Sequence, residues 1–377
     1  MPSVAIIGTR GYPSYYGGFE TAVRKLAPYL CDAGWDVAVY GREGAVMPKD
    51  PTLDPRVRSV LTRGLDSKSL STLSFGFTAS LDALRTKPDV ALVMNVANGY
   101  YLPMLRARGI KTVVNVDGIE WDRAKWGRAA KSVFRGGARL AARCADSLVY
   151  DSREIERRWR SDFGRTGHFI PYGGERVDQL PIEPGLRHRG YALVVARFVP
   201  ENTIPEFLEA ATTISKQMPV VIVGSSGYGG DLDNRVESLQ RDNSNIQWFG
   251  HISDDRRLLA LWQHAGVYFH GHSVGGTNPT LVQAMALGAP TVARDTPYNR
   301  EVLGDTGLFV DPNPDAIAEA VLAAALDEPS LEQMSRAAAR RAKELYTWES
   351  VCGAYESALR EQIVAVGASG SRQQGLV

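Results

Sequence analysis

Short apolar runs, each ending in a polar or glycine-rich loop, alternate along the chain with segments of helical periodicity. In the first half the runs are residues 4–8, 36–40, 90–95, 112–117 and 147–151. Runs that are apolar on both faces are typical of parallel strands covered by helices. Between the first two, Phe19, Val23 and Leu26 recur at the spacing of one helix face. This alternation predicts a parallel α/β sheet.

The alternation stops between residues 171 and 190, where proline and glycine concentrate, and then restarts. The second set of runs is 191–196, 219–224, 246–249, 267–270, 291–293 and 308–310. Two strand–helix series divided by a linker predict an α/β protein with two doubly wound domains, 1–172 and 190–345, facing across a cleft. Ligands of such sheets bind beyond the carboxyl ends of the strands, which makes the cleft the expected site.

Charge, cysteine content and hydropathy exclude several classes of protein. The 43 Lys and Arg nearly balance the 42 Asp and Glu, which argues against a nucleic-acid binder. The three cysteines lie far apart, so a disulfide scaffold is excluded and a cytoplasmic location is expected. The first residues are typical of a buried strand rather than a signal peptide, and no apolar stretch is long enough to span a bilayer.

Glycines follow the first predicted strand, at Gly8, Gly11, Gly17 and Gly18, with Arg10 among them. Glycines before a helix let a diphosphate approach backbone N–H groups at the helix N-terminus. The same residues also suit a tight strand-to-helix turn. The spacing is not G-x-G-x-x-G, so the dinucleotide fingerprint is absent.

Asn115 and Asp117 end another predicted strand. The Asp117 carboxylate could accept hydrogen bonds from sugar hydroxyls or act as a base, and Asp before Gly is also ordinary turn chemistry. Glu120 is either a further ligand or the cap of the next helix.

The second domain offers Arg197 at the end of its first strand, where a guanidinium suits a phosphate.

Residues 270–285 form the strongest motif. There Asn278 is predicted to cap a helix that begins at Pro279, and Gly288 to end it. Exposed amides before this helix would bind an anion; they belong to Gly275, Gly276, Thr277 and Asn278. Gln283 could bond a ribose, whereas His270 and His272 lack a third metal ligand.

A basic run follows Trp121. Between Trp121 and His168 there are 12 Lys and Arg against 6 Asp and Glu. The run comprises Arg123, Lys125, Arg128, Lys131, Arg135, Arg139 and Arg143. Such a helix is typical of a reversible contact with an anionic membrane, or of a solvated helix face.

At these motifs the chain resembles, over essentially its whole length, the retaining glycosyltransferases of family 4, which have the GT-B fold. Tyr16-Gly17-Gly18-Phe19-Glu20 is similar to the family's diphosphate-contacting GGxE loop. Ala196-Arg197-Phe198-Val199-Pro200-Glu201 is similar to its "GR(x)xPEK" strand end. Residues 275–283 stand where the family has E-x7-E, and residues 284–290 resemble its "EAMAxGxPV".

A narrower set of motifs resembles the bacterial rhamnosyltransferase branch, whose members build cell-wall and capsular polysaccharide. The set comprises GTRGYP with YGGFE, DGIEW, Pro200-Glu201-Asn202, HGHSVGGTNP and Asn299-Arg300-Glu301-Val302-Leu303-Gly304. The resemblance implies an enzyme that transfers L-rhamnose from dTDP-L-rhamnose with retention, onto a glycan or lipid-linked acceptor, without metal or cofactor. The nucleotide sugar is then a substrate, and the enzyme is expected in the cytoplasm or on the inner face of the plasma membrane.

The resemblance also assigns residues, with four departures from the family pattern. It implies catalytic roles for Asp117 and Arg197. Donor contacts fall on Arg10, Gly17, Gly18, His272, Gly275, Gly276, Thr277, Asn278 and Gln283, and acceptor contacts on Glu20, Asn115 and Glu120. The departures are Asn202 for a lysine, Gly275 and Gln283 for the two glutamates, and Asp117 for a histidine.

Further expectations concern domain roles and rival activities. Domain 1–172 would bind the acceptor and domain 190–345 the nucleotide sugar, with a helix at about 349–366 packing back on the first domain. A sugar-nucleotide epimerase of the same fold, a transferase using a UDP- or GDP-sugar, a nicotinamide oxidoreductase and a non-catalytic binding module remain as alternatives.

Overall fold

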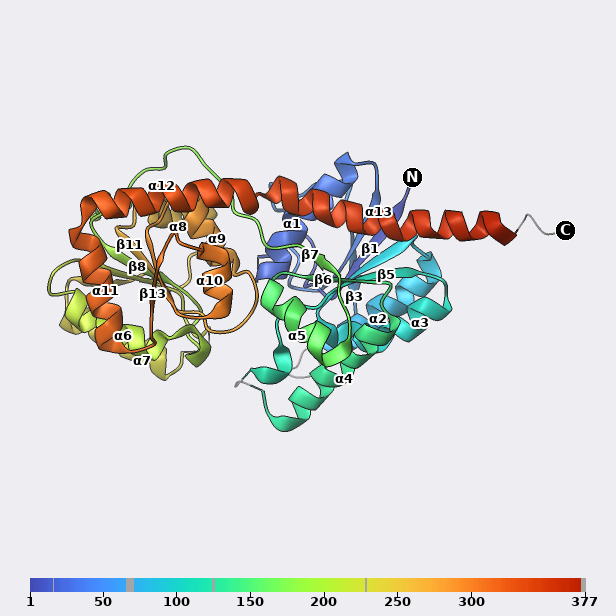
Figure 1. Cartoon of the computed structure of the whole chain (residues 1–377), viewed down its shortest axis with the longest axis horizontal. Coiled ribbons are helices and arrows are strands. Elements are labelled where there is room, and N and C mark those ends of the chain that lie inside the picture. Colours follow the sequence, from blue (N-terminus) through green and yellow to red (C-terminus); the bar gives the residue numbers. More distant parts are fainter. Residues whose placement is uncertain (16, 66–70, 124–125, 228, 374–377) are drawn as a thin grey trace. The chain divides into compact units, whose positions relative to one another are not determined.

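The computed structural model describes residues 1–15, 17–65, 71–123, 126–227 and 229–373, without the side chains beyond residue 364. The chain divides into two units, Met1–Pro171 with Trp348–Val377, and Tyr172–Thr347. Each unit contains one parallel sheet with helices on both faces (Figure 1). The two doubly wound sheets predicted from the sequence are thereby confirmed.

The first unit contains β1 (Ser3–Ile7), α1 (Gly18–Asp32), β2 (Asp36–Arg42), β3 (Arg58–Thr62), α2 (Ser71–Thr86), β4 (Val90–Met94), η1 (Val96–Tyr101), α3 (Leu102–Ala107), β5 (Lys111–Asn115), η2 (Glu120–Asp122), α4 (Arg128–Cys144), β6 (Ser147–Tyr150), α5 (Arg153–Phe163), β7 (His168–Phe169) and α13 (Trp348–Gln373). Its strand order is β3-β2-β1-β4-β5-β6-β7. The chain order reverses between β1 and β4, so this sheet has its topological switch point there.

The second unit contains β8 (Ala192–Val195), η3 (Pro200–Asn202), α6 (Ile204–Ile214), β9 (Val220–Val223), α7 (Asp231–Asp242), β10 (Ile246–Trp248), α8 (Asp255–His264), β11 (Val267–His270), α9 (Pro279–Ala286), β12 (Thr291–Arg294), α10 (Pro297–Leu303), β13 (Leu308–Val310), α11 (Pro314–Leu326) and α12 (Glu328–Leu345). Its strand order, β10-β9-β8-β11-β12-β13, places the switch point between β8 and β11.

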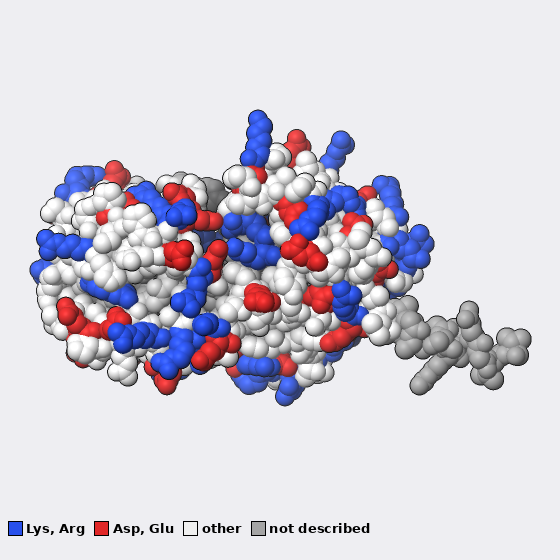
Figure 2. Space-filling view, turned by 90° about the horizontal axis from the view of Figure 1, so that it is seen from above, with Lys and Arg blue, Asp and Glu red and all other residues white. Residues whose placement is uncertain are grey.

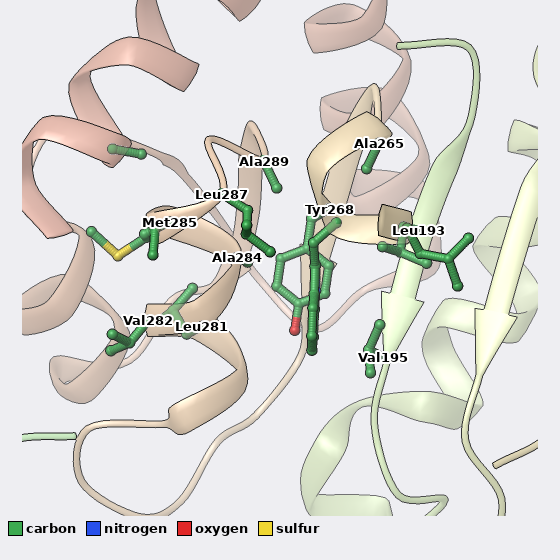
Figure 3. Close-up of a cluster of buried hydrophobic side chains, with 14 of the residues drawn as sticks. Leu193, Val195, Ala265, Tyr268, Leu281, Val282, Ala284, Met285, Leu287 and Ala289 are labelled. Atoms are coloured by element: carbon green, nitrogen blue, oxygen red, sulfur yellow. The ribbon is translucent and has the colours of Figure 1, made fainter. Parts of the chain in front are cut away.

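Successive residues of the central strands enter opposite cores. On β8, Leu193 and Val195 pack with α8, α9 and α12, whereas Ala192 and Val194 pack with α6, α7 and α11. Figure 3 shows Tyr268 of β11 between the side chains of β8 and those of α9. Because side chains alternate across a strand, a strand buried on both faces must be apolar throughout. This is the pattern that the sequence displays.

Acidic and basic side chains are interspersed on the surface shown in Figure 2, in keeping with a net charge of +1.

Helix α13 belongs to the core of the first unit. Val351, Tyr355 and Leu359 are buried with apolar residues of α1, and Figure 1 shows both helices on the same face of the first sheet.

Replacing Leu359 with alanine is expected to destabilise the first unit by about 2–5 kcal/mol, since a fully buried leucine leaves a cavity. Val364 on the same helix is 70% exposed, so Val364→Ala serves as the control and should stay within about 0.5 kcal/mol. Urea unfolding followed by circular dichroism measures both. Equal stability of the two variants would show that α13 is not part of this core.

Candidate functional site

The loop after β1 lies at the switch point of the first sheet. Gly8 has a φ of 95°, and a Cβ there would lie 2.3 Å from the Met94 carbonyl oxygen, so only glycine fits. The backbone N–H of Arg10 donates to Glu20 Oε1 over 2.9 Å, and Glu20 is buried. Glu20, predicted as an acceptor ligand, thus ties this loop to the first turn of α1.

The two glycines of the GGxE-like motif begin α1. Gly17 is the N-cap in an extended conformation, with φ of −170°, and Gly18 is the first helical residue. Among the described residues, a Cβ on Gly17 would have one neighbour within 4 Å, Glu20 Oε2 at 3.4 Å. The fold itself therefore tolerates a side chain at Gly17, and a close approach of a ligand remains the predicted reason for glycine. Tyr16, the first residue of the motif, lies outside the described residues.

Asn115 and Asp117 stand at the carboxyl end of β5. Asn115 is buried; its Oδ1 accepts from the Asp117 N–H over 2.9 Å, and its Nδ2 donates to Tyr355 Oη over 2.6 Å. Burial raises the pKa of the Tyr355 phenol, which stays un-ionised. Asn115, predicted to bind the acceptor, uses both the oxygen and the nitrogen of its amide in hydrogen bonds within the protein. Asp117 is half-buried.

Glu120, the third predicted acceptor ligand, is buried in η2. Its Oε1 lies 2.7 Å from Arg123 Nε, and its Oε2 accepts from Trp126 Nε1 over 2.7 Å. The carboxylate therefore joins the segment after β5 to the start of α4. A role as acceptor ligand remains a prediction that would require it to exchange these partners.

Arg197 follows β8 at the switch point of the second sheet, and its side chain is exposed. In the described part of the chain, its guanidinium has no hydrogen-bond or ion-pair partner. The buried Asn202 donates from Nδ2 to the Arg197 carbonyl oxygen over 2.9 Å. The residue that replaces the family lysine thus fixes the backbone of the predicted phosphate-binding arginine.

The turn between β11 and α9 forms as predicted. Asn278 is the N-cap of α9, and its Oδ1 accepts from the Thr280 N–H over 3.0 Å. Pro279 is the first helical residue, and Gly288 follows the helix with φ of 70°. Gly275 has φ of 110° with open space around its Cβ position, so the chain turns there without crowding. The predicted cap and ends of this helix are confirmed.

Two segments, η3 with the following Thr203 and helix α10, hold the residues before this helix in place. The N–H and Oγ of Ser273 both donate to the Glu201 carbonyl oxygen, over 2.9 and 2.8 Å. Thr203 Oγ1 donates to the Gly271 carbonyl, and Asn299 Nδ2 to that of His272 over 3.0 Å. Sequence reasoning assigned no role to Thr203 or Asn299. Asn299 stood within a quoted motif, but its partner lies 27 residues away.

Comparison with protein families decides the class of the molecule. Residues 17–173 match the glycosyl transferase 4-like domain, and residues 183–341 match the glycosyl transferases group 1. The chain is a group 1 glycosyltransferase of family 4. This family comprises retaining hexosyltransferases.

Several curated mannosyltransferases are similar to this glycosyltransferase. O-antigen chain mannosyltransferase B of Escherichia coli is 26% identical over 216 residues, which cover 50% of this chain and 56% of that protein. MMP alpha-(1->4)-mannosyltransferase of Mycolicibacterium hassiacum is 26% identical, with 97% and 99% covered. Phosphatidyl-myo-inositol mannosyltransferase of Mycobacterium tuberculosis is 27% identical, with 59% and 60% covered.

Two solved structures share the GT-B fold of this glycosyltransferase. Sucrose-phosphate synthase from Thermosynechococcus elongatus matches with a TM-score of 0.80 and 21% identity, covering 97% of this chain and 100% of that one. Anabaena Alr3699/HepE in complex with UDP and glucose matches with a TM-score of 0.73 and 15% identity, covering 96% and 99%.

A contact within the second unit explains why this glycosyltransferase has Gln283 where the family has glutamate. Gln283 Oε1 accepts from the Glu175 N–H over 2.9 Å, and Nε2 donates to the Glu175 carbonyl over 2.7 Å. A carboxylate could make only the first of these bonds. The amide therefore fits this contact better than glutamate does, and the predicted bond to a ribose would require the pair with Glu175 to open.

His270 and His272 stack face to face, with ring centroids 4.5 Å apart and planes 13° apart. His270 is fully buried and its Nδ1 lies 3.0 Å from Tyr268 Oη. Burial, and then the charge of His272, hold the pKa of His270 well below its usual 6.5. Among the described residues, no three His, Cys, Asp or Glu side chains gather closely enough to hold a metal ion.

Stability is expected to fall as the pH drops below about 6.5, the ordinary pKa of histidine. There the unfolded chain protonates His270 while the folded chain does not, so protons favour unfolding. The loss of Tm between pH 7.5 and 5.5 should be smaller in His270→Phe than in wild type. His251 is exposed, so His251→Asn serves as the control with the wild-type slope. Identical slopes in all three proteins would contradict this role of His270.

Proposed function

We propose that this glycosyltransferase moves a hexose, with retention, from a nucleoside diphosphate sugar onto a glycan or lipid-linked acceptor in cell-surface polysaccharide synthesis. The observation that supports the donor class best is Arg197, an exposed guanidinium without a protein partner among the described residues, at the switch point of the second sheet. The buried Asn202 holds the backbone carbonyl of Arg197. A guanidinium on a held backbone, without a partner among the described residues, suits a phosphate ligand.

The proposed mechanism relies on charge that develops on the leaving diphosphate. Arg197 and the amides of residues 275–278 would stabilise the departing phosphate more strongly than the bound donor, and so accelerate the reaction. The family resemblance assigns further donor contacts to Arg10, Gly17 and Gly18 of the first unit. In this scheme the acceptor attacks the face from which the diphosphate leaves, and a phosphate oxygen accepts its proton. Asp117 binds hydroxyls of the reacting sugars.

We propose dTDP-L-rhamnose as the donor, on the strength of the rhamnosyltransferase-like motifs. A mannose nucleotide such as GDP-mannose is the second candidate, because the curated relatives named above are mannosyltransferases. A 6-deoxy sugar and mannose differ in their hydroxyl pattern. A site that bonds a hydroxyl discriminates strongly against a sugar that lacks it.

A panel of dTDP-L-rhamnose, GDP-mannose and UDP-glucose, measured by thermal shift and by product analysis with and without glycan acceptor, tests the donor. At equal concentrations of the three donors we expect dTDP-L-rhamnose to stabilise most, and a donor at 100 times its Kd to add about 2.7 kcal/mol. A larger shift with GDP-mannose would replace the proposed donor. Isomerised nucleotide sugar formed without acceptor would indicate an epimerase instead.

Arg197→Ala should lower kcat/KM for the donor about 10²–10³-fold, as expected for the loss of one donor to a developing oxyanion. Arg197→Lys should rescue only in part, because the fork geometry is lost. Arg340 is exposed on α12 of the same unit, and Arg340→Ala serves as the control with wild-type kinetics. Near-normal kinetics of Arg197→Ala would remove the arginine from the site.

We further propose that α4 brings the enzyme to the cytoplasmic, anionic surface of a membrane that carries its acceptor. Lys131, Arg135, Arg139 and Arg143 recur every four residues and so form one stripe. None of the four forms an ion pair with a described residue. In the part of the chain that the structure describes, no helix is long and apolar enough to cross a bilayer.

Two aromatic residues stand among the basic residues of this segment, Trp126 and Phe134, and both contact the protein itself. The rings of Trp126 and Phe134 pack against each other with centroids 5.2 Å apart, and Trp126 also donates to Glu120. The proposed contact therefore relies on charge rather than on their insertion. Lys125, another member of the basic run, lies outside the described residues.

The triple variant Lys131→Gln, Arg135→Gln and Arg139→Gln should no longer sediment with anionic vesicles at low salt, because each cation contributes about 1 kcal/mol near such a surface. Wild type should sediment and be released at high salt. The matched control neutralises Arg153, Arg157 and Arg160 of α5, which pair with Glu154 and Glu156. Equal sedimentation with neutral and anionic vesicles, or none with either, would contradict the proposal.

A further inference from the structure

Two neighbouring strand ends in the first sheet share a rare backbone conformation. Asn95 directly follows β4 with φ of 69°, and Asp117 follows β5 with φ of 61°. Positive φ costs a residue with a side chain about 1–2 kcal/mol, least for asparagine and aspartate. Asn95 also lies at the switch point of the sheet, beside the Gly8 turn. Strained residues at such positions cluster in ligand sites.

A side-chain hydrogen bond joins these two residues. Asn95 Nδ2 donates to Asp117 Oδ2 over 3.0 Å, while Asn95 Oδ1 accepts from the Ala97 N–H over 2.9 Å. Because the Ala97 N–H can only donate, the oxygen of the amide must face it and the NH₂ group must face the carboxylate. The orientation of the Asn95 amide is therefore fixed by the chain itself.

Asn95 and Asp117 are both hydrogen-bonded to the buried Asn115. Its backbone carbonyl accepts from the Asn95 N–H over 3.0 Å, and its side-chain Oδ1 accepts from the Asp117 N–H over 2.9 Å. The remaining end of the Asn115 amide is bonded to Tyr355 on α13. Backbone and side-chain bonds thus hold both strand ends at a fixed separation.

Among the described residues, the Asp117 carboxylate is hydrogen-bonded at one of its two oxygens. Oδ2 receives the Asn95 amide, whereas Oδ1 has no hydrogen-bond partner among the residues that the structure describes. The carboxylate is half-buried, so a ligand can reach it. We infer that Asn95 is a positioning residue, which fixes the rotation of the Asp117 carboxylate so that Oδ1 accepts a hydroxyl of the sugar substrate. This inference rests on the function proposed above for Asp117.

Two substitutions of Asn95 remove the N–H donor in different ways. Asn95→Gly takes away the amide and keeps positive φ accessible. Asn95→Asp keeps the shape and the acceptor for the Ala97 N–H, but places a second carboxylate against Asp117. Each should lower kcat/KM for sugar transfer about 10–100-fold, the cost of a misplaced reacting group. Affinity for the free nucleoside diphosphate should not change, because no contact with the diphosphate is proposed for Asn95 or Asp117.

An exchange of the two side chains separates positioning from folding. In the double variant Asn95→Asp with Asp117→Asn, the hydrogen bond can form again with donor and acceptor interchanged. We expect the Tm to recover toward wild type, while sugar transfer stays as low as in Asp117→Asn alone. Recovery of transfer together with the Tm would show that the pair is merely structural and overturn the inference.

Lys87 provides the matched control, since it is exposed and has φ of 51° in the same unit. Lys87→Gly should transfer sugar at the wild-type rate. If Asp117→Asn also transfers normally, the role proposed for Asp117 fails and this inference fails with it. If Asp117→Asn is inactive while Asn95→Gly and Asn95→Asp are fully active, only the role of Asn95 is refuted.

Discussion

The parallel pairing of β1 with β4, and of β8 with β11, determines where chemistry can take place in each unit. At these two pairs the chain leaves neighbouring strands in opposite directions, so the loops diverge and the carboxyl edge of the sheet stays accessible. Residues for which ligand contacts or ligand positioning are proposed follow these strands. Gly8, Arg10 and Asn95 follow β1 and β4, and Arg197 and the turn at Gly275 follow β8 and β11.

Buried polar groups then determine the shape of these loops. Asn115, Asn202 and Thr203 are nearly inaccessible to solvent. Asn115 and Asn202 bond backbone groups of their own loops, and Thr203 bonds the Gly271 carbonyl of another loop. A buried amide without partners would cost free energy, so these bonds form as sets rather than singly. The exposed side chains of the site are thereby carried by loops that are themselves rigidly supported.

Features encoded locally in the sequence were predictable, and those that depend on distant partners were not. The apolar strands and the Asn278 cap follow from neighbouring residues. β3 escaped prediction because it is a half-exposed edge strand, and β7 because it has only two residues. The bonds of Gln283 to Glu175 and of Asn95 to Asp117 join residues 108 and 22 positions apart. The residues next to each partner in the sequence do not indicate such contacts.

The position of α13 in the first unit has a consequence for biosynthesis. The residues that complete the core of that unit, from Val351 to Leu359, are translated after the whole of the second unit. The second unit is continuous in sequence and has all its core residues before then. On the ribosome, the second unit can therefore fold first. The apolar face of α1 stays without the residues of α13 that cover it until synthesis is nearly finished. Chains interrupted before residue 351 would expose that face to aggregation and to proteolysis.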